Sequence, residues 1–273
     1  MTYRAPAFML RNYAAERIAI PSTEITARNS TGMTTANKIA LIDGRRGPEC
    51  TWTATSVNHG FTYDLGAATI AQNINRCVLA PGHTLDDNRW NTFSTADSAF
   101  ANVNLTLRNQ TTIALGNQGV VDLELSADVN LRYWMFRCDT SVNGDFIATD
   151  FWPGHYEQLG DDLQIGTKLE YEVRDDVVER TIAGSEYTVE LSPPRKAFTL
   201  EVGWLNPGTD DFDIIDRVVS SRSNSFWYWP PDDAIGGPYL VKLTSSARRE
   251  QDHPVPRVSN TYRVRLEMVE QIG

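Results

Sequence analysis

Hydrophobic residues recur at every second position in several segments of the chain. This alternation is clearest in residues 103–109, 121–126 and 262–270. It is typical of strands in antiparallel sheets, which have one buried face and one face in water. The residues predicted to be buried are Val103, Leu105 and Leu107; Val121, Leu123 and Leu125; and Tyr262, Val264, Leu266 and Met268.

Residues 131–138 have a different pattern, because apolar and aromatic side chains occupy both faces. Tyr133 and Met135 point one way, and Trp134 and Phe136 point the other way. This favours a central strand that is packed on both sides. Turn signals follow one another at short spacing between residues 41 and 138, which indicates a β-sandwich or jelly roll.

One helix is predicted, in the second half of the chain. Phe212, Ile215, Val218 and Val219 form an apolar stripe, and Thr209 is placed to act as the N-cap. Three aspartates in the first turn oppose the positive end of the helix dipole. The rest of residues 161–273 is expected to be β-rich.

Composition narrows the function classes. The chain has 273 residues, a formal charge of -10 and 41% hydrophobic residues. The composition predicts a globular protein, and the negative charge would be repelled by the phosphate backbone of a nucleic acid. The three cysteines, Cys50, Cys77 and Cys138, include no CxxC pair, and buried thiols are the simplest interpretation. We find no secretory signal and no transmembrane run, so we expect synthesis in the cytoplasm.

Several segments resemble the galactose-binding-like, discoidin-type jelly roll. They are Trp52, the strand from Phe61 to Gly66 that ends in Asp-Leu-Gly, the rim Pro81 to Leu85, and the strand Leu131 to Phe136. In the Asp-Leu-Gly strand, Asp64 is expected to bond the turn backbone and Gly66 to let the chain reverse. Phe61, Tyr63 and Leu65 are expected to face the core.

A second resemblance spans nearly the whole chain. Residues 36–48 (ANKIALIDGRRGP) and residues 143–160 (NGDFIATDFWPGHYEQLG) are similar to phrases found in minor tail proteins of bacteriophages. The later order of an aromatic strand, a helix, a second aromatic strand and a final strand is similar too. The pattern differs at Thr149 and Asp150, where that family usually has glycine or arginine.

This resemblance implies a structural protein of the virion tail or baseplate, and two domains. Residues 1–160 would form the jelly roll with an N-terminal arm, and residues 161–273 a β-rich domain that anchors it. The implied partners are other tail proteins and further copies around the tail axis, without nucleic acid or membrane insertion. The alternatives are a module that binds carbohydrate on the host surface and a collar or head decoration protein.

The rim of the jelly roll is the candidate carbohydrate site. A sugar site needs an aromatic platform and planar hydrogen-bonding side chains. The candidates are His83, Asp86, Asn88, Arg89 and Trp90, and an ordinary solvated loop is the competing interpretation.

The subunit-interface candidates are Trp152, Trp227 and Trp229. In residues 226–229, one aromatic pair is expected to lie in the core. The other pair covers a neighbouring element, contacts another subunit or stacks on a sugar.

No catalytic motif is present, so we do not expect an enzyme. No cofactor is predicted, and no metal site is assigned. The adjacent Asp86 and Asp87 leave a structural calcium open.

Overall fold

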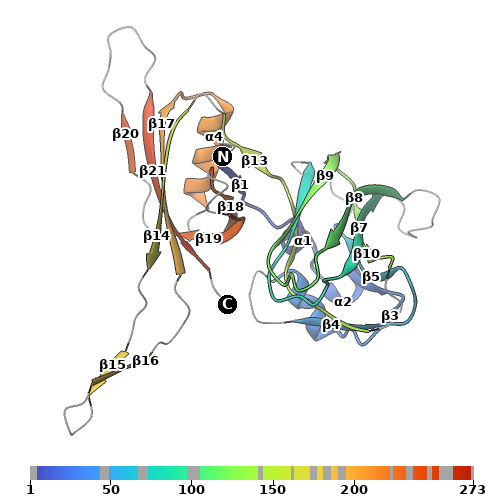
Figure 1. The fold of residues 1–273 in the computed structure, drawn as a ribbon. Helices are drawn as coiled ribbons and strands as arrows, with labels where there is room; N and C mark the ends of the chain where they lie inside the picture. Colours follow the sequence, from blue (N-terminus) through green and yellow to red (C-terminus); the bar gives the residue numbers. More distant parts are fainter. Residues whose placement is uncertain are drawn as a thin grey trace. The chain divides into compact units, whose positions relative to one another are not determined.

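A computed structural model describes most of the chain (Figure 1). The described residues are 5–43, 49–66, 73–96, 105–140, 144–160, 163–172, 177–180, 186–189, 195–221, 224–231, 236–244, 248–251 and 261–271. The chain divides into two compact units. We call residues 11–156 the jelly-roll unit. The described residues within 1–10 and 157–272 form the open-sheet unit.

The jelly-roll unit is built from three antiparallel sheets. The five-stranded sheet has the order β2 (Ile25–Arg28), β5 (His59–Asp64), β10 (Tyr133–Cys138), β7 (Asn88–Thr95) and β8 (Thr106–Ile113). One three-stranded sheet has the order β12 (Phe151–Gly154), β6 (Ile74–Leu79) and β9 (Val121–Val129). The other has the order β11 (Asp145–Ala148), β4 (Cys50–Ala54) and β3 (Ser30–Thr31). Short helical segments precede β4, namely α1 (Tyr13–Arg17), α2 (Pro21–Glu24), α3 (Thr35–Lys38) and the 3-10 turn η1 (Ile39–Leu41).

The core of the jelly-roll unit is unusually aromatic. Trp52, Phe61, Trp90, Phe136 and Phe151 are each at most 2% exposed and belong to one cluster. Trp90 stacks on Phe136 with ring centroids 4.9 Å apart. Because β7, β10 and β5 are neighbours, every second residue on them faces this cluster.

The open-sheet unit contains one eight-stranded sheet. Its order is β13 (Glu157–Gln158), β1 (Ala7–Met9), β18 (Phe226–Trp229), β19 (Tyr239–Leu243), β21 (Tyr262–Glu270), β17 (Arg195–Leu205) and β14 (Gln164–Glu172), with β20 (Arg248–Gln251) also paired to β21. The strands β15 (Val177–Arg180) and β16 (Glu186–Val189) pair with each other. The helix α4 (Asp210–Ser220) packs Ile214, Ile215 and Val218 against one face of the sheet (Figure 1).

Most elements follow the sequence pattern. The predicted fold class is confirmed, because the chain is mainly β, with a jelly-roll sandwich followed by a β-rich domain with one short helix in its described part. Thr209 caps α4 by accepting a hydrogen bond from the backbone N–H of Phe212. Gly66 donates its backbone N–H to Asp64 Oδ1 at 2.9 Å, as the Asp-Leu-Gly turn predicts.

Two expectations differ from the structure. Leu107 is 43% exposed, because a register shift in the β7–β8 pair interrupts the alternation, and Leu105 is only partly buried; Val103 lies outside the described residues. The N-terminal arm is expected to belong to the jelly roll, whereas its strand β1 pairs with β13 and β18 in the open-sheet unit.

Candidate functional site

The predicted rim site loses its aromatic platform, because Trp90 is fully buried. Its indole N–H donates to the carbonyl oxygen of Leu85 at 2.8 Å, and its ring packs against Phe136. A side chain without exposed surface cannot stack on a sugar. The first residues of β7 follow a turn, and the sequence does not show which of them point inward.

His83 is also buried rather than displayed on the rim. Its Nε2 lies 2.9 Å from the carbonyl oxygen of Gly119, and its Nδ1 accepts the backbone N–H of Leu85. Burial lowers the pKa of His83, although the hydrogen bond to Gly119 acts against this. These contacts give His83 a role in fixing the loop before β7.

The other rim candidates are partly exposed but already bonded. Asp86 Oδ2 accepts the backbone N–H of Gly116, and Asn88 Nδ2 donates to the carbonyl oxygen of Asp86. Arg89 is exposed and its Nε donates to Asp139 Oδ1 at 2.8 Å. Of the five candidates, Arg89 alone reaches a larger group of planar polar side chains.

That group lies on the outer face of the five-stranded sheet, opposite the aromatic core. Register pairing places Arg28 beside Gly60, Gly60 beside Arg137, Arg137 beside Asn91, and Asn91 beside Gln110. Paired residues of antiparallel strands share a face. We call Arg28, Arg137, Asn91 and Gln110 the polar row.

Hydrogen bonds hold one half of the polar row in place. Gln110 Nε2 donates to Asn91 Oδ1 at 2.9 Å, and Asn91 Nδ2 donates to Asp139 Oδ2 at 2.7 Å. Burial of Asp139 would raise its pKa, but the hydrogen bonds from Arg89 and Asn91 outweigh burial, and the pKa is lowered. The carboxylate therefore stays charged and fixes the orientation of Asn91.

The subunit-interface candidates offer little surface to a neighbour. Trp152 is 5% exposed and Trp227 is fully buried, while Trp229 is half-buried. Phe226 and Tyr228 belong to the core of the open-sheet unit, as predicted for one pair of this strand. Of the three tryptophans, Trp229 keeps the most exposed surface.

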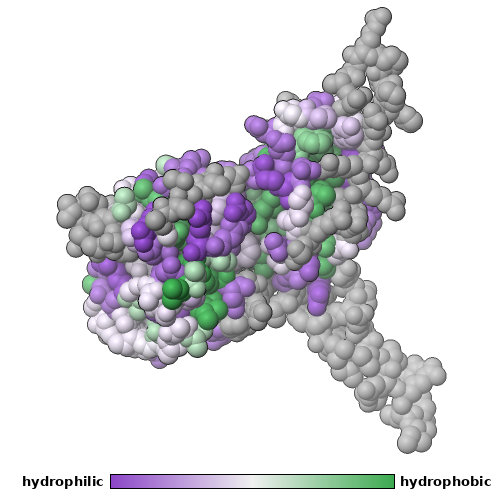
Figure 2. Space-filling model, turned by 180° about the vertical axis from the view of Figure 1, so that it is seen from behind, coloured by the Kyte–Doolittle hydropathy of each residue, from purple (hydrophilic) through white to green (hydrophobic). Residues whose placement is uncertain are grey.

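Trp204 is an exposed tryptophan that the sequence pattern does not single out. It is 56% exposed and has a φ of 63°, at the register shift where β17 meets β21. A positive φ is uncommon for a bulky residue. On the face shown in Figure 2, hydrophobic residues occur in scattered groups among hydrophilic ones.

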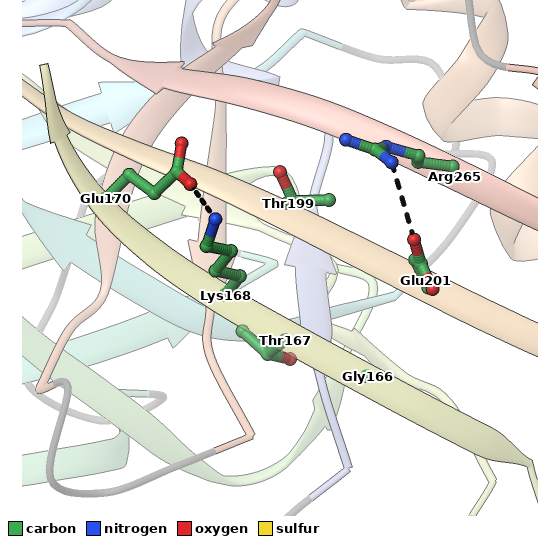
Figure 3. Close-up of a pocket in the computed structure, with 7 residues that line it drawn as sticks. All are labelled: Gly166, Thr167, Lys168, Glu170, Thr199, Glu201 and Arg265. Carbon is green, nitrogen blue, oxygen red and sulfur yellow. Dashed lines mark ion pairs between the residues drawn. The ribbon is translucent and has the colours of Figure 1, made fainter.

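A shallow hollow of about 380 Å³ lies on strands β14, β17 and β21 (Figure 3). Its charged side chains are paired with one another, since Lys168 contacts Glu170 and Arg265 contacts Glu201. Gly166 is paired with Glu201 and has no side chain to fill the hollow at this position. With its charges satisfied and no aromatic lining, the hollow offers a ligand few contacts.

The described ranges contain neither a metal-binding cluster nor a membrane-spanning helix. Within them, no three His, Cys, Asp or Glu side chains are placed to hold a metal ion. No helix in the same ranges is long and apolar enough to cross a membrane. The three cysteines are buried free thiols, and burial raises the pKa of Cys50 to about 12.

No family model matches this sequence, and no curated protein matches it. Part of the chain is similar to carbohydrate-binding modules of family 32. A module of a family 31 glycoside hydrolase from Clostridium perfringens is 12% identical, with 50% of this chain and 98% of that chain covered and a TM-score of 0.37. The NanJ module from the same organism, in complex with galactose, is 16% identical, with 55% and 99% covered and a TM-score of 0.36.

The AlyQ module, in complex with 4,5-unsaturated mannuronic acid, is 20% identical, with 47% and 92% covered and a TM-score of 0.34. The saccharides in these descriptions are ligands of those proteins. With TM-scores below 0.5, the similarity carries no argument about this chain.

Proposed function

We propose that the jelly-roll unit is a non-catalytic module that binds carbohydrate through the polar row. The observation that supports this is the cross-strand series of planar side chains on one sheet face, with Asn91 fixed by Gln110 and Asp139. Amide and guanidinium groups bond sugar hydroxyls in defined directions. The proposal moves the predicted sugar site from the rim to the adjacent sheet face, which the rim candidate Arg89 contacts through Asp139.

A glycan array probed with the whole chain, followed by isothermal titration with the best glycan, tests this proposal. Gln110 is exposed, so Gln110→Ala should weaken binding at least about tenfold, equivalent to the loss of one to two good hydrogen bonds. Gln118→Ala is the matched control, an exposed glutamine of the same unit outside the row. No binding to any glycan, or equal binding by both variants, would contradict the proposal.

A second candidate function is assembly into a bacteriophage virion, in the tail, the collar or the head. The resemblance of residues 36–48 and 143–160 to tail proteins motivates it, and the exposed Trp204 favours it. Tryptophan is enriched among residues that dominate protein interfaces. The open-sheet unit would then attach the chain and the jelly-roll unit would face outward.

This candidate is tested by locating the protein in purified particles. Trp204→Ala should reduce its incorporation, whereas Leu115→Ala, which changes a 79% exposed residue of the other unit, should not. Absence of the wild-type chain from particles would remove the virion role and leave carbohydrate binding to be judged by titration.

A further inference from the structure

Arg28 and Arg137 lie on either side of one residue of β5, and within the described ranges neither forms an ion pair with a carboxylate. Each is paired with Gly60, from opposite sides of β5. Neighbouring strands lie about 4.8 Å apart, so their Cα atoms are separated by about 10 Å. Gly60 carries no side chain between them. An added Cβ there would lie 2.1 Å from the carbonyl oxygen of Phe136, so this position excludes larger residues.

The two guanidinium groups are also partly removed from water. Both arginines are half-buried, and the Nε of each is buried without a hydrogen-bond partner. Arg137 lies over the ring of Phe93, with Cζ 4.4 Å from the centroid. Burial lowers the pKa of Arg137 and the charge of Arg28 lowers it further, while the charge of Asp139 acts against both. Two like charges in this position repel each other, and a bound anion would relieve that repulsion.

Seven other basic residues of the described ranges are each paired with a carboxylate. The ion pairs are Arg11–Glu16, Arg76–Asp122, Arg89–Asp139, Arg132–Asp64, Lys168–Glu170, Arg217–Glu157 and Arg265–Glu267. The carboxylate nearest to Arg137 in sequence, Asp139, is already bonded by Arg89 and Asn91. With a chain charge of -10, two neighbouring arginines that form no ion pair in the described part of the chain are a specific feature rather than a result of composition.

We propose that Arg28 and Arg137 bind an anionic group, a carboxylate or a sulfate, carried by an acidic saccharide. Guanidinium groups match the oxygen geometry of both anions. The exposed side-chain amide of Gln110 continues the row and suits a hydroxyl group of the same ligand, while Asn91, which is 2% exposed, holds Gln110 in place. This inference deepens the proposed function, because it names the ligand class of the polar row.

Isothermal titration of the whole chain with methyl glucuronide, methyl glucoside and sodium sulfate tests the inference. The glucuronide should bind at least about tenfold more tightly than the neutral glucoside, because charge-assisted hydrogen bonds are the stronger ones. Arg28→Gln and Arg137→Gln should each remove most of this preference. Arg132→Gln is the control, since Arg132 is exposed, lies in the same unit and is paired with Asp64.

A thermal unfolding measurement keeps the test valid if a variant folds less well. Sulfate should raise the Tm of the wild-type chain and of Arg132→Gln, and should raise the Tm of Arg137→Gln much less. Equal shifts in all three proteins would overturn the anion site.

The remaining outcomes separate the two proposals. Equal binding of glucuronide and glucoside would overturn the anion inference and leave carbohydrate binding standing. Sulfate binding without glucuronide binding would overturn the saccharide assignment. Binding of a glutamate-rich peptide as tightly as the glucuronide would also overturn the saccharide assignment and would indicate an acidic protein partner.

Discussion

At the scale of single residues, Trp90 and His59 show how much of the jelly-roll unit depends on buried polar aromatics. Their ring centroids are 5.6 Å apart, and both side chains are fully buried. Trp90 bonds the carbonyl oxygen of Leu85, and His59 Nδ1 accepts the indole N–H of Trp52 at 3.1 Å. Trp90 Nε1 and His59 Nδ1 are therefore used inside the unit, whereas His59 Nε2 is buried without a hydrogen-bond partner among the described residues.

Trp90→Ala should therefore act on stability. Removal of a buried tryptophan leaves a cavity, and we expect a loss of about 3–5 kcal/mol in the free energy of unfolding. Trp204→Ala, at an exposed position, should change it by less than about 1 kcal/mol. Denaturant titration of both variants checks this. A Trp90→Ala protein with wild-type stability would show that the ring is not buried in solution.

His59 should make the chain sensitive to acid. Burial lowers the pKa of His59 to about 4, whereas histidine in an unfolded chain has a pKa of about 6.5. Between these values the unfolded state binds more protons than the folded state, so the free energy of unfolding decreases as the pH falls from 6.5 to 4. The contribution is at most about 1.4 kcal/mol per pH unit.

The comparison of His59→Phe with His155→Gln isolates this effect. In the His59→Phe variant, the free energy of unfolding should no longer decrease in this pH range. Its overall stability can still be lower, because Trp52 loses its hydrogen-bond acceptor. The His155 variant should keep the decrease. Urea unfolding at several pH values provides the measurement, and an unchanged slope in His59→Phe would assign the acid sensitivity to other groups.

At the scale of elements, β1 is the clearest case of a strand whose partners are remote in sequence. Phe8 is fully buried and lies against the rings of Phe226 and Tyr228, with centroids 6.2 and 5.6 Å away. β1 fills the place between β13 and β18. A strand of three residues can be held there because both of its edges are paired.

Phe8→Ala should consequently weaken the open-sheet unit and leave the jelly-roll unit intact. We expect hydrogen exchange to increase in β17, β18 and β19 and to stay unchanged in β5, β7 and β10. Phe61→Ala, which opens a cavity in the core of the jelly-roll unit, should give the reverse pattern. Equal loss of protection in both units after Phe8→Ala would contradict the assignment of β1.

At the scale of the whole molecule, the sequence predicts where strands and helices lie along the chain better than it predicts which strands pair. Alternation identifies β9 and β21, and the capping pattern identifies α4, because these signals are local. The place of β1 depends on pairing across more than 140 residues, between Phe8 and Glu157, and a three-residue strand carries no pattern that specifies it. The burial of Trp90 cannot be predicted for a similar reason. Its strand begins directly after a turn, and the sequence does not show which of the first residues point into the core.

The polar row also cannot be predicted from the sequence pattern. Its members lie on four different strands, from Arg28 to Arg137, and only the strand order brings them onto one face. The alternation in β10 does show that Arg137 points away from Phe136. It does not show which residue of which strand lies beside it.

The most direct test of the central claim is an NMR titration of the whole chain with the best-binding saccharide, observed through the side-chain amide signals. We predict saturable shifts of the Asn91 and Gln110 signals, with the Gln118 signal unchanged. Shifts confined to Asn88 and Gln118, near the predicted rim, would contradict the assignment of the polar row, and an absence of any saturable shift would contradict carbohydrate binding itself.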